Sequence, residues 1–380
     1  MSEDIKSYVL EHYEKGFENK TMIARMAIKH FDLEDKITVE KLRRSISKFI
    51  QKNILSKDNP ALVEECEAVG IDPSTVGQTW YKGKHWSISF KPDKTGPTFE
   101  DMLRDHIEDV KKHTFNYEKI ERIHSTDGCL LVIDPADVHI GKLATSFESG
   151  EDYNTQIAVK RVKDGVKGIL SKSAGFNIDQ ILFVGGNDIL HIDTPKRTTS
   201  AGTPQDTDGM WYENFLVAKR LYIDVLDELM KVADVHFVFN PSNHDYQSGF
   251  FLSDSISSWY ENCENITFDV SIAHRKYYKY YNNLIGTTHG DGAKMQDLPI
   301  LMAQEAGEDW SNAKNRYVYI HHIHHKMSKD FVGVTVEALR SPSGTDSWHH
   351  RNGYQHAPKA VEGFIHSKNH GQIARFTHLF

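Results

Sequence analysis

The sequence predicts an α/β protein that carries a small all-α domain at its N-terminus. From Gly128 onward, short apolar segments rich in β-forming residues alternate with longer segments of helical periodicity. Residues 1–56, by contrast, have apolar residues only at helical spacing. A chain of 380 residues is long enough for two domains. We therefore expect a layered α/β sandwich over 126–380, a helical domain over 1–56, and a connector over 57–125.

Bulk composition narrows the class of protein. A hydrophobic fraction of 39% and an aromatic fraction of 11% are typical of a soluble protein, and no apolar run is long enough to span a membrane. The N-terminus is charged from its third residue, so we expect no signal peptide. Cys66, Cys129 and Cys263 form no CxxC pair, which favours reduced thiols and a cytoplasmic location. The net charge of −8 argues against a uniformly basic surface but not against a local basic stripe.

The N-terminal domain is expected to contain three short helices, at 2–17, 20–31 and 38–53, with Thr38 capping the third. This order suggests a helix-turn-helix unit whose third helix contacts DNA. The basic residues that would make those contacts are Lys41, Arg43, Arg44 and Lys48. The alternative is the solvated face of a helical bundle.

The connector contains two recognisable elements. Residues 80–91 alternate like a β-hairpin, which could form a wing on the helical domain. Residues 98–113 have the pattern of a helix capped at Thr98 that leads into the main domain.

In the main domain, polar clusters follow the predicted strands. Strands are expected at 129–134, 180–186 and 235–241, with helices at 157–172 and 211–231 between them and further strands within 276–290, 315–325 and 331–339. The clusters contain Asp137 and His139, then Asp188, then Asn243, His244 and Asp245, then His289, and finally His322 and His324. We expect all five clusters to leave the same edge of one sheet. Their oxygen and imidazole ligands suit two divalent ions such as Mn, Fe or Zn. One such cluster alone would be weak evidence, because Asp and His are common at strand ends as caps.

These five clusters resemble the signature of the calcineurin-like metallophosphoesterases, which reads DxH, GD, GNH(D/E), H and GHxH. The resemblance implies a four-layer αββα sandwich and two metal ions, with Mn expected first. One ion would be held by Asp137, His139 and His324, and the other by Asn243, His289 and His322. Asp188 would bridge the two ions, and His244 would be the proton donor. Two ions sharing a carboxylate would acidify a bridging water to hydroxide, which attacks phosphorus while His244 protonates the leaving alkoxide.

Two positions depart from the signature. Asn187 replaces the glycine before Asp188, and His321 replaces the glycine before His322. Neither change removes a ligand, but both put the local turn geometry in question because glycine permits backbone conformations that other residues avoid.

A finer resemblance concerns His191, which lies three residues after Asp188. Protein phosphatases of the family have Asp at that position, whereas Asp188-Ile-Leu-His191 followed by Pro195 resembles the GDLFH…P motif of double-strand-break repair nucleases. This resemblance covers about 130–325 and implies that His191 lies over the scissile phosphate with His244. The alternative for His191 is a strand-end histidine that bonds a loop carbonyl. Those nucleases are usually dimers, so a homodimer is also implied.

Two further segments admit two interpretations. The loop 197–209 would either contact substrate beside the metals or serve as a solvated connector. In the C-terminal segment, Trp348, His349, His350 and Tyr354 would either stack on bases and flank phosphates or belong to an ordinary closing strand and helix.

The main functional prediction is a metal-dependent DNA nuclease, either an exonuclease or an endonuclease, that uses the basic helix to hold DNA. Phage-type phosphoesterases show a similar fusion, so a viral origin and a host-cytoplasm location are consistent with the resemblance. A phosphomonoesterase or a nucleotide phosphodiesterase is the alternative, because these enzymes share the fold and the metals. A non-catalytic DNA-binding regulator is a third hypothesis, against which the complete ligand set counts.

Overall fold

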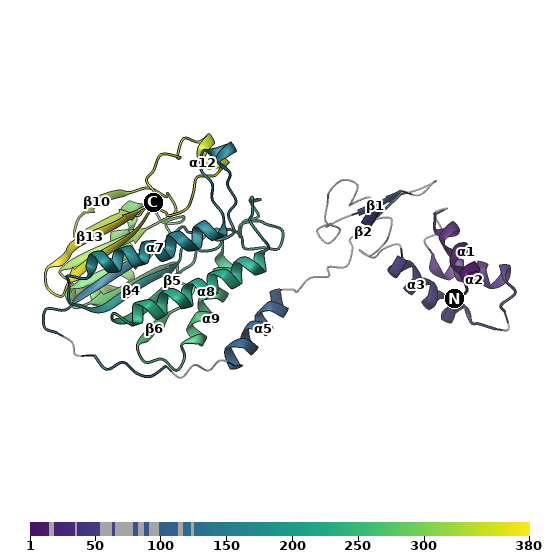
Figure 1. Ribbon diagram of the computed structural model, residues 1–380, viewed down its shortest axis with the longest axis horizontal. Helices are drawn as coiled ribbons and strands as arrows, with labels where there is room; N and C mark the ends of the chain where they lie inside the picture. The colour runs from purple at the N-terminus through teal and green to yellow at the C-terminus, as the bar shows by residue number, and fades with distance from the viewer. Residues whose placement is uncertain are drawn as a thin grey trace. The chain divides into compact units, whose positions relative to one another are not determined.

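The computed structural model describes residues 1–14, 19–34, 36–53, 63–64, 79–82, 87–90, 99–112, 117–122 and 125–380. Cys66 and most of the predicted connector over 57–78 lie outside the described residues. The chain divides into two compact units, Met1–Thr98 and Phe99–Phe380. Figure 1 traces the elements of each unit.

The first unit contains three helices and a hairpin. The helices are α1 (Glu3–Glu14), α2 (Lys20–His30) and α3 (Val39–Asn53), and the hairpin pairs β1 (Thr79–Lys82) with β2 (Ser87–Phe90) in antiparallel register. The helices meet through apolar residues at helical spacing, among them Val9, Ile23, Leu42, Ile46 and Ile50. Asn19 caps α2, and Thr38 Oγ1 accepts a hydrogen bond from Lys41 N at 3.3 Å at the start of α3. The predicted helices are therefore present, while the helix-turn-helix assignment stays a prediction.

The second unit is built on two β-sheets. Its first helices are α5 (Phe99–Lys112), α6 (Ser146–Ser149), α7 (Thr155–Ser173), α8 (Trp211–Met230) and α9 (Tyr246–Trp259), and its later ones are α10 (Leu298–Glu305), α11 (Gly307–Asn312) and α12 (Ser347–Arg351). The six-stranded sheet has the order β13 (Gly371–Leu379), β12 (Ala360–Ser367), β3 (Cys129–Asp134), β4 (Ile178–Gly186), β5 (Asp234–Asn240), β6 (Ile266–Asp269). The five-stranded sheet has the order β10 (Met327–Phe331), β11 (Val334–Ala338), β9 (Asn315–Ile320), β8 (Asn283–Thr288), β7 (Arg275–Tyr280). The 3₁₀ turn Met295–Asp297 precedes α10.

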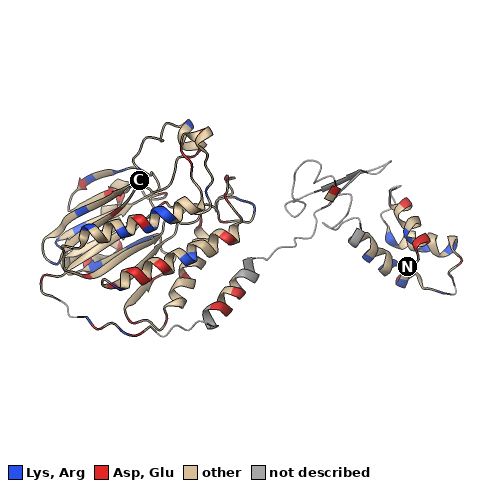
Figure 2. Cartoon of the chain, viewed as in Figure 1, with Lys and Arg blue, Asp and Glu red and all other residues tan. Residues whose placement is uncertain are grey.

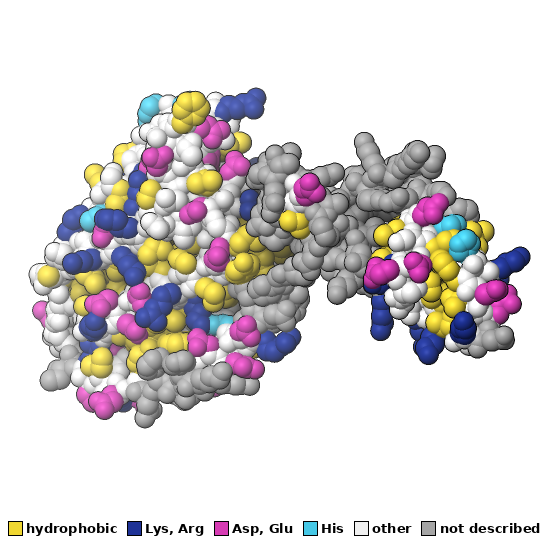
Figure 3. Space-filling model, turned by 45° about the vertical axis from the view of Figure 1, so that its right-hand side comes forward, with side chains coloured by type: hydrophobic (Ala, Val, Ile, Leu, Met, Phe, Trp, Pro, Cys, Tyr) yellow, Lys and Arg dark blue, Asp and Glu magenta, His cyan; other side chains and the backbone are white. Residues whose placement is uncertain are grey.

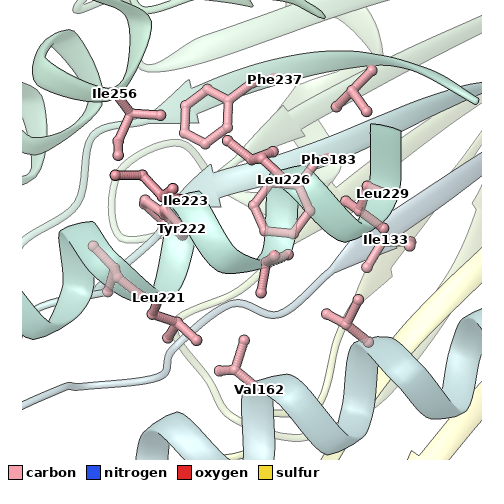
Figure 4. Packing of buried hydrophobic residues seen from close by; sticks show 14 of the residues in the cluster. Ile133, Val162, Phe183, Leu221, Tyr222, Ile223, Leu226, Leu229, Phe237 and Ile256 are labelled. Atoms are coloured by element: carbon pink, nitrogen blue, oxygen red, sulfur yellow. The ribbon is translucent and has the colours of Figure 1, made fainter. Parts of the chain in front are cut away.

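Alternation along β3 shows how the layers are stacked. Leu131 and Ile133 pack against the cluster formed with α7, α8 and α9, whereas Leu130 and Val132 face a second cluster that includes Ile285 of the other sheet. Figure 4 shows the first cluster, in which the rings of Phe183 and Phe237 and the side chains of α8 fill the space between sheet and helices. A third cluster covers the outer face of the five-stranded sheet with residues of α10. The layers thus run helices, sheet, sheet, helices, which confirms the predicted sandwich.

The C-terminal strands complete the first sheet, in line with the closing strand and helix that were one interpretation of this segment, although their place in the sheet was not predicted. β12 inserts between β13 and β3 and pairs antiparallel with both. Glu362 on β12 is fully buried and paired with Arg340 at 2.7 Å, so this part of the core contains a compensated charge. Among the described helices, none has the length and apolarity needed to cross a bilayer.

Candidate metal centre

The five polar clusters come together, but from two sheets rather than one. β3, β4 and β5 are parallel neighbours in the six-stranded sheet, and β8 and β9 are parallel neighbours in the five-stranded sheet. The expectation that all clusters leave one edge of a single sheet is therefore wrong. The carboxyl ends of both sets of strands meet instead, so that His322 N donates to Asp137 Oδ2 at 3.0 Å across the two sheets. The predicted αββα sandwich already contains two sheets, but local periodicity does not show to which of them a strand belongs.

The first group of candidate ligands contains Asp137, His139 and His324, the set predicted for one ion. Their ligand atoms lie within 4.8 Å of one another. His139 Nε2 lies 3.3 Å from His324 Nε2, and Asp137 Oδ1 lies 3.5 Å from the same His324 nitrogen. Asp137 Oδ1 is buried and has no hydrogen-bond partner among the described residues. An unpaired buried carboxylate oxygen facing imidazole nitrogens is costly unless a cation joins them.

The second group converges on one nitrogen of His289. Its Nε2 lies 2.9 Å from Asn243 Oδ1, 3.2 Å from Asp188 Oδ2 and 3.2 Å from His322 Nδ1. These are the residues predicted for the other ion, together with Asp188. Two oxygens and two imidazole nitrogens are a donor set that divalent transition metals accept.

The protonation states of both groups of candidate ligands favour the binding of a cation. Burial raises the pKa of the Asp137 carboxyl, but His324 and His289 outweigh this and hold it below its usual range. Burial acts in the same direction on Asp188, where His289 and His244 likewise lower the pKa overall. Burial, followed by the charge of His244, lowers the pKa of His139, and burial also lowers the pKa of His324. Ionised carboxylates and neutral imidazoles are the forms that bind metals.

His289 is the exception. Burial lowers its pKa, but Asp188 and Asp137 raise it overall to about 9. Asp188 and Asp137 thus stabilise the protonated, positively charged form of His289. Binding of a metal ion would release the proton from His289.

Backbone strain is concentrated at the same place. Among the described residues, the non-glycine positions with positive φ include Asp137, His139, Asn187, Asp188, His322 and His324. Each lies in the left-handed region, which costs roughly 1–2 kcal/mol for an ordinary residue. Six such residues lie in the loops of one site. This indicates that the backbone is strained there and that the strain orients these side chains.

The two departures from the family signature have different structural outcomes. Asn187 has φ of 52°, so it adopts the conformation that a glycine there would supply, and asparagine tolerates it best among residues with a Cβ. His321 is not among the positive-φ residues. Its ring instead bonds Thr288 O at 3.0 Å through Nδ1 and Asp134 Oδ2 at 2.9 Å through Nε2, which ties the end of β9 to β8 and β3.

His244 lies beside the first group with one nitrogen fixed. Its Nδ1 donates to the carbonyl oxygen of His191 at 2.9 Å, since a carbonyl can only accept. This fixes the tautomer and leaves Nε2 as the nitrogen available to a substrate. The backbone N–H of His244 donates to Asp188 Oδ1 at 2.9 Å, so the same residue also orients the carboxylate.

His191 is buried, with 3% exposure. Its Nδ1 lies 3.3 Å from His139 Nδ1, and its ring stacks on that of His244 at 5.2 Å between centroids. Burial, together with the charge of Lys142, lowers the pKa of His191 well below its usual value. A neutral His191 in this position can hold the ring of His139 and the ring of His244.

Sequence reasoning did not predict Ser242, and it named Asp245 without its role in supporting the ligands. Ser242 Oγ accepts from Asp188 N at 2.7 Å and donates to Asp245 Oδ1 at 2.7 Å, while Asp245 Oδ2 accepts from Leu190 N at 2.8 Å. Burial, with the charge of Asp188, raises the pKa of Asp245 to about 8. The position of Asp245 after His244 was the only available signal.

The loop after the second cluster packs on the site. Ser200 N donates to Asn243 O at 3.2 Å, and Asp193 accepts from the first N–H groups of α9 at Gln247 and Ser248. The loop is therefore ordered and helps to hold the backbone of Asn243 in place. The sequence had left the role of this loop open.

The predicted DNA-contacting residues lie on α3 in the other unit. Lys41, Arg44 and Lys48 are exposed and Arg43 is half-buried, whereas Leu42, Ile46 and Ile50 of the same helix are buried. Figure 2 shows the distribution of basic and acidic residues along the chain. Arg43 and Arg44 both bond Glu40, at 2.7 and 3.0 Å.

No protein-family model and no curated protein matches the sequence. Among solved structures, the chain is similar to an archaeal phosphodiesterase, with 9% identity, a TM-score of 0.32, and coverage of 66% of this chain and 99% of that one. It is also similar to zinc-complexed Vps29 from Entamoeba histolytica, at 12% identity, a TM-score of 0.29 and coverage of 66% and 98%. A third similarity is to a putative 5'-nucleotidase from Staphylococcus aureus, at 11% identity, a TM-score of 0.32 and coverage of 66% and 54%. At these levels of similarity, function must be inferred from the site itself.

Proposed function

We propose that the protein is a two-metal phosphodiesterase of the calcineurin-like type that acts on DNA. The observation that carries the proposal is the pair of adjacent ligand groups, with His244 beside them and its Nε2 available. The first ion would be held by Asp137, His139 and His324, and the second by Asn243, His289 and His322, with Asp188 between them. Mn is the expected metal, and the same donors accept Fe or Zn. When bound, such ions lower the pKa of water and offset the charge on phosphoryl oxygens.

The chain's own residues prepare and complete the reaction. The carboxylate of Asp188 accepts a hydrogen bond from His244 N, and the backbone N–H of Asp188 donates to Ser242 Oγ, so the residue is held in place before substrate arrives. His244, fixed through Nδ1, would give a proton from Nε2 to the leaving alkoxide. With 3% exposure, His191 would act by keeping the rings of His139 and His244 in place rather than by lying over the scissile phosphate.

Two observations favour a diester in DNA over a phosphomonoester. His191 stands where protein phosphatases of the family have Asp, and the exposed bases of α3 offer charges for a phosphate backbone. One observation favours the alternative of a phosphomonoesterase or nucleotide phosphodiesterase. Arg43 and Arg44 already share Glu40 as a partner, which reduces the net charge available to DNA.

The test is hydrolysis by the full chain with Mn²⁺. Bis-p-nitrophenyl phosphate, p-nitrophenyl phosphate and labelled linear single- and double-stranded DNA would be compared, each against Asp188→Asn. We expect cleavage of the diester and of DNA, and loss of both in the variant. Rapid turnover of the monoester with intact DNA would replace the proposal by the phosphomonoesterase. Absence of any turnover by a metal-loaded protein would favour the regulator.

A further inference from the structure

The C-terminal segment around α12 is anchored at the metal centre. Buried Lys142, at the end of the first polar cluster, contacts Gly344 O at 2.7 Å, Ser343 Oγ at 3.3 Å and Asp346 Oδ2 at 2.8 Å. Asp346 also caps α12 by accepting from His349 N at 2.8 Å, and it bonds His349 Nδ1 at 2.7 Å. Burial lowers the pKa of the Lys142 ammonium, while Asp346 opposes that effect. A desolvated ion pair of this kind fixes the segment in place.

A row of rings leads outward from this anchor. His349 stacks on the candidate ligand His324, with centroids 4.9 Å apart, and Trp348 meets His349 edge-on at 5.1 Å. Tyr354 lies next to Trp348, at 5.8 Å. The inner end of the row is therefore at the metal centre and the outer end is at the surface.

The two outer rings are open to solvent. Trp348 is 60% exposed and Tyr354 is 55% exposed. The last turn of α12 carries the basic residues His350 and Arg351, both exposed, whereas the nearby acid Asp346 is already paired. Figure 1 places α12 at the top of the second unit, and Figure 3 shows hydrophobic, basic and histidine side chains exposed side by side in that region. Exposed rings beside exposed basic groups match a strand of bases joined by phosphates.

We propose that Trp348 and Tyr354 form a stacking site for an unpaired nucleobase of the substrate, next to the phosphate at the metal centre. The proposal deepens the proposed function and rests on it. The stacking site requires a base that has left its duplex, so it assigns the substrate class as single-stranded DNA or a frayed strand end. Stacking on aromatic rings tolerates any base, so no sequence preference is expected.

The test measures binding and cleavage separately. The full chain carrying His244→Ala, with Mn²⁺, would be titrated with a short oligothymidylate and with an abasic strand that has the same number of phosphates. Trp348→Ala and Tyr354→Ala should each weaken binding of the oligothymidylate by roughly 5- to 150-fold, the size of one base–aromatic stack. Neither should change binding of the abasic strand, and Trp348→Phe should restore most of the loss. Tyr281→Ala is the matched control, because Tyr281 is 59% exposed at the turn between β7 and β8, at the opposite end of β8 from His289.

Equal binding of the two strands by the parent protein would overturn the stacking site, as would an equal loss for both strands in Trp348→Ala. Cleavage by the protein without His244→Ala then separates the two proposals. If that protein cleaves no DNA while the preference for bases still depends on Trp348, the nuclease proposal fails and the stacking site stands.

Discussion

The candidate metal centre and the basic face of α3 both concentrate charged side chains, but the first is buried and the second is exposed. Asp137 and Asp188 are at most 1% exposed, and their loops contain strained left-handed residues. Arg44 and Glu40 on α3 have side chains that are 73% and 55% exposed. Removing charges from water is expensive unless a partner compensates, whereas an exposed pair is worth about 0–1 kcal/mol. A buried cluster of acids and histidines is therefore stronger evidence of function than an exposed basic face.

The largest effect on metal content and activity is expected at Asp188, the carboxylate that the two ions would share. Asp188→Asn removes a charge from the position between the two groups, so both ions should be lost together. Metal analysis of the purified variant should find neither ion, and hydrolysis of bis-p-nitrophenyl phosphate should fall to the uncatalysed rate. Asp254→Asn, an exposed acid on α9, is the matched control and should keep both metals and activity. Retention of one full equivalent of metal by Asp188→Asn would argue against a bridge.

The next effect separates chemistry from metal binding. His244→Ala removes the proposed acid but none of the proposed ligands, so turnover of a diester should fall by roughly 10²–10⁴-fold with metal content unchanged. The control is His370→Ala, which removes an exposed histidine from the turn between β12 and β13. Loss of metal in His244→Ala would reassign His244 from acid to ligand.

These two residues illustrate what the sequence could predict. Asp188 and His244 follow strands with clear apolar runs, so motif and spacing were enough to predict that the two residues lie together, as their 2.9 Å contact shows. The supporting residues were not visible, because contacts such as Asp134 with His321 and Lys142 with Asp346 join positions about two hundred residues apart. Local periodicity carries no information on such pairs.

The same limit explains the error about the sheets. The strands that carry His289 and His322 look like continuations of the first sheet, since each has the same apolar pattern and polar end. The strands that precede these residues, β8 and β9, pair with each other in the five-stranded sheet instead. The α3 face was predicted from its charges alone, and the pairing of Arg43 and Arg44 with Glu40 is a side-chain detail that charge counting does not reveal.

A third prediction concerns His106, a buried titratable residue away from the metal centre. His106 on α5 is 3% exposed and contacts Lys219, and burial together with the charge of Lys219 lowers its pKa to about 4. The unfolded chain would bind a proton near pH 6.5 and the folded chain only near pH 4, so stability should be complete above 6.5 and fall as pH drops through that window. The difference corresponds to about 3 kcal/mol at most.

Thermal unfolding of the full chain between pH 7 and 4 measures this effect. His106→Phe should flatten the pH dependence, whereas His370→Phe should leave it unchanged. Identical pH profiles for both variants would show that His106 is solvated in the protein. The comparison between buried and exposed charges would then have the metal centre as its only buried example.

The smallest effect is expected from substitutions on the exposed basic face of α3. Whether DNA binding becomes weaker or stronger distinguishes these substitutions. Arg43→Ala with Arg44→Ala should weaken binding of double-stranded DNA and reduce the slope of log affinity against log salt by about 1 for each phosphate that is no longer neutralised. Arg25→Ala with Lys29→Ala, which removes two exposed charges from α2, is the control and should change the slope less. Glu40→Gln should act in the opposite direction, because it frees both guanidinium groups from a carboxylate whose pKa their hydrogen bonds hold at about 2. If Glu40→Gln leaves affinity unchanged while the metal centre still cleaves DNA, α3 is a solvated bundle face, and the buried site holds its substrate without help from the first unit.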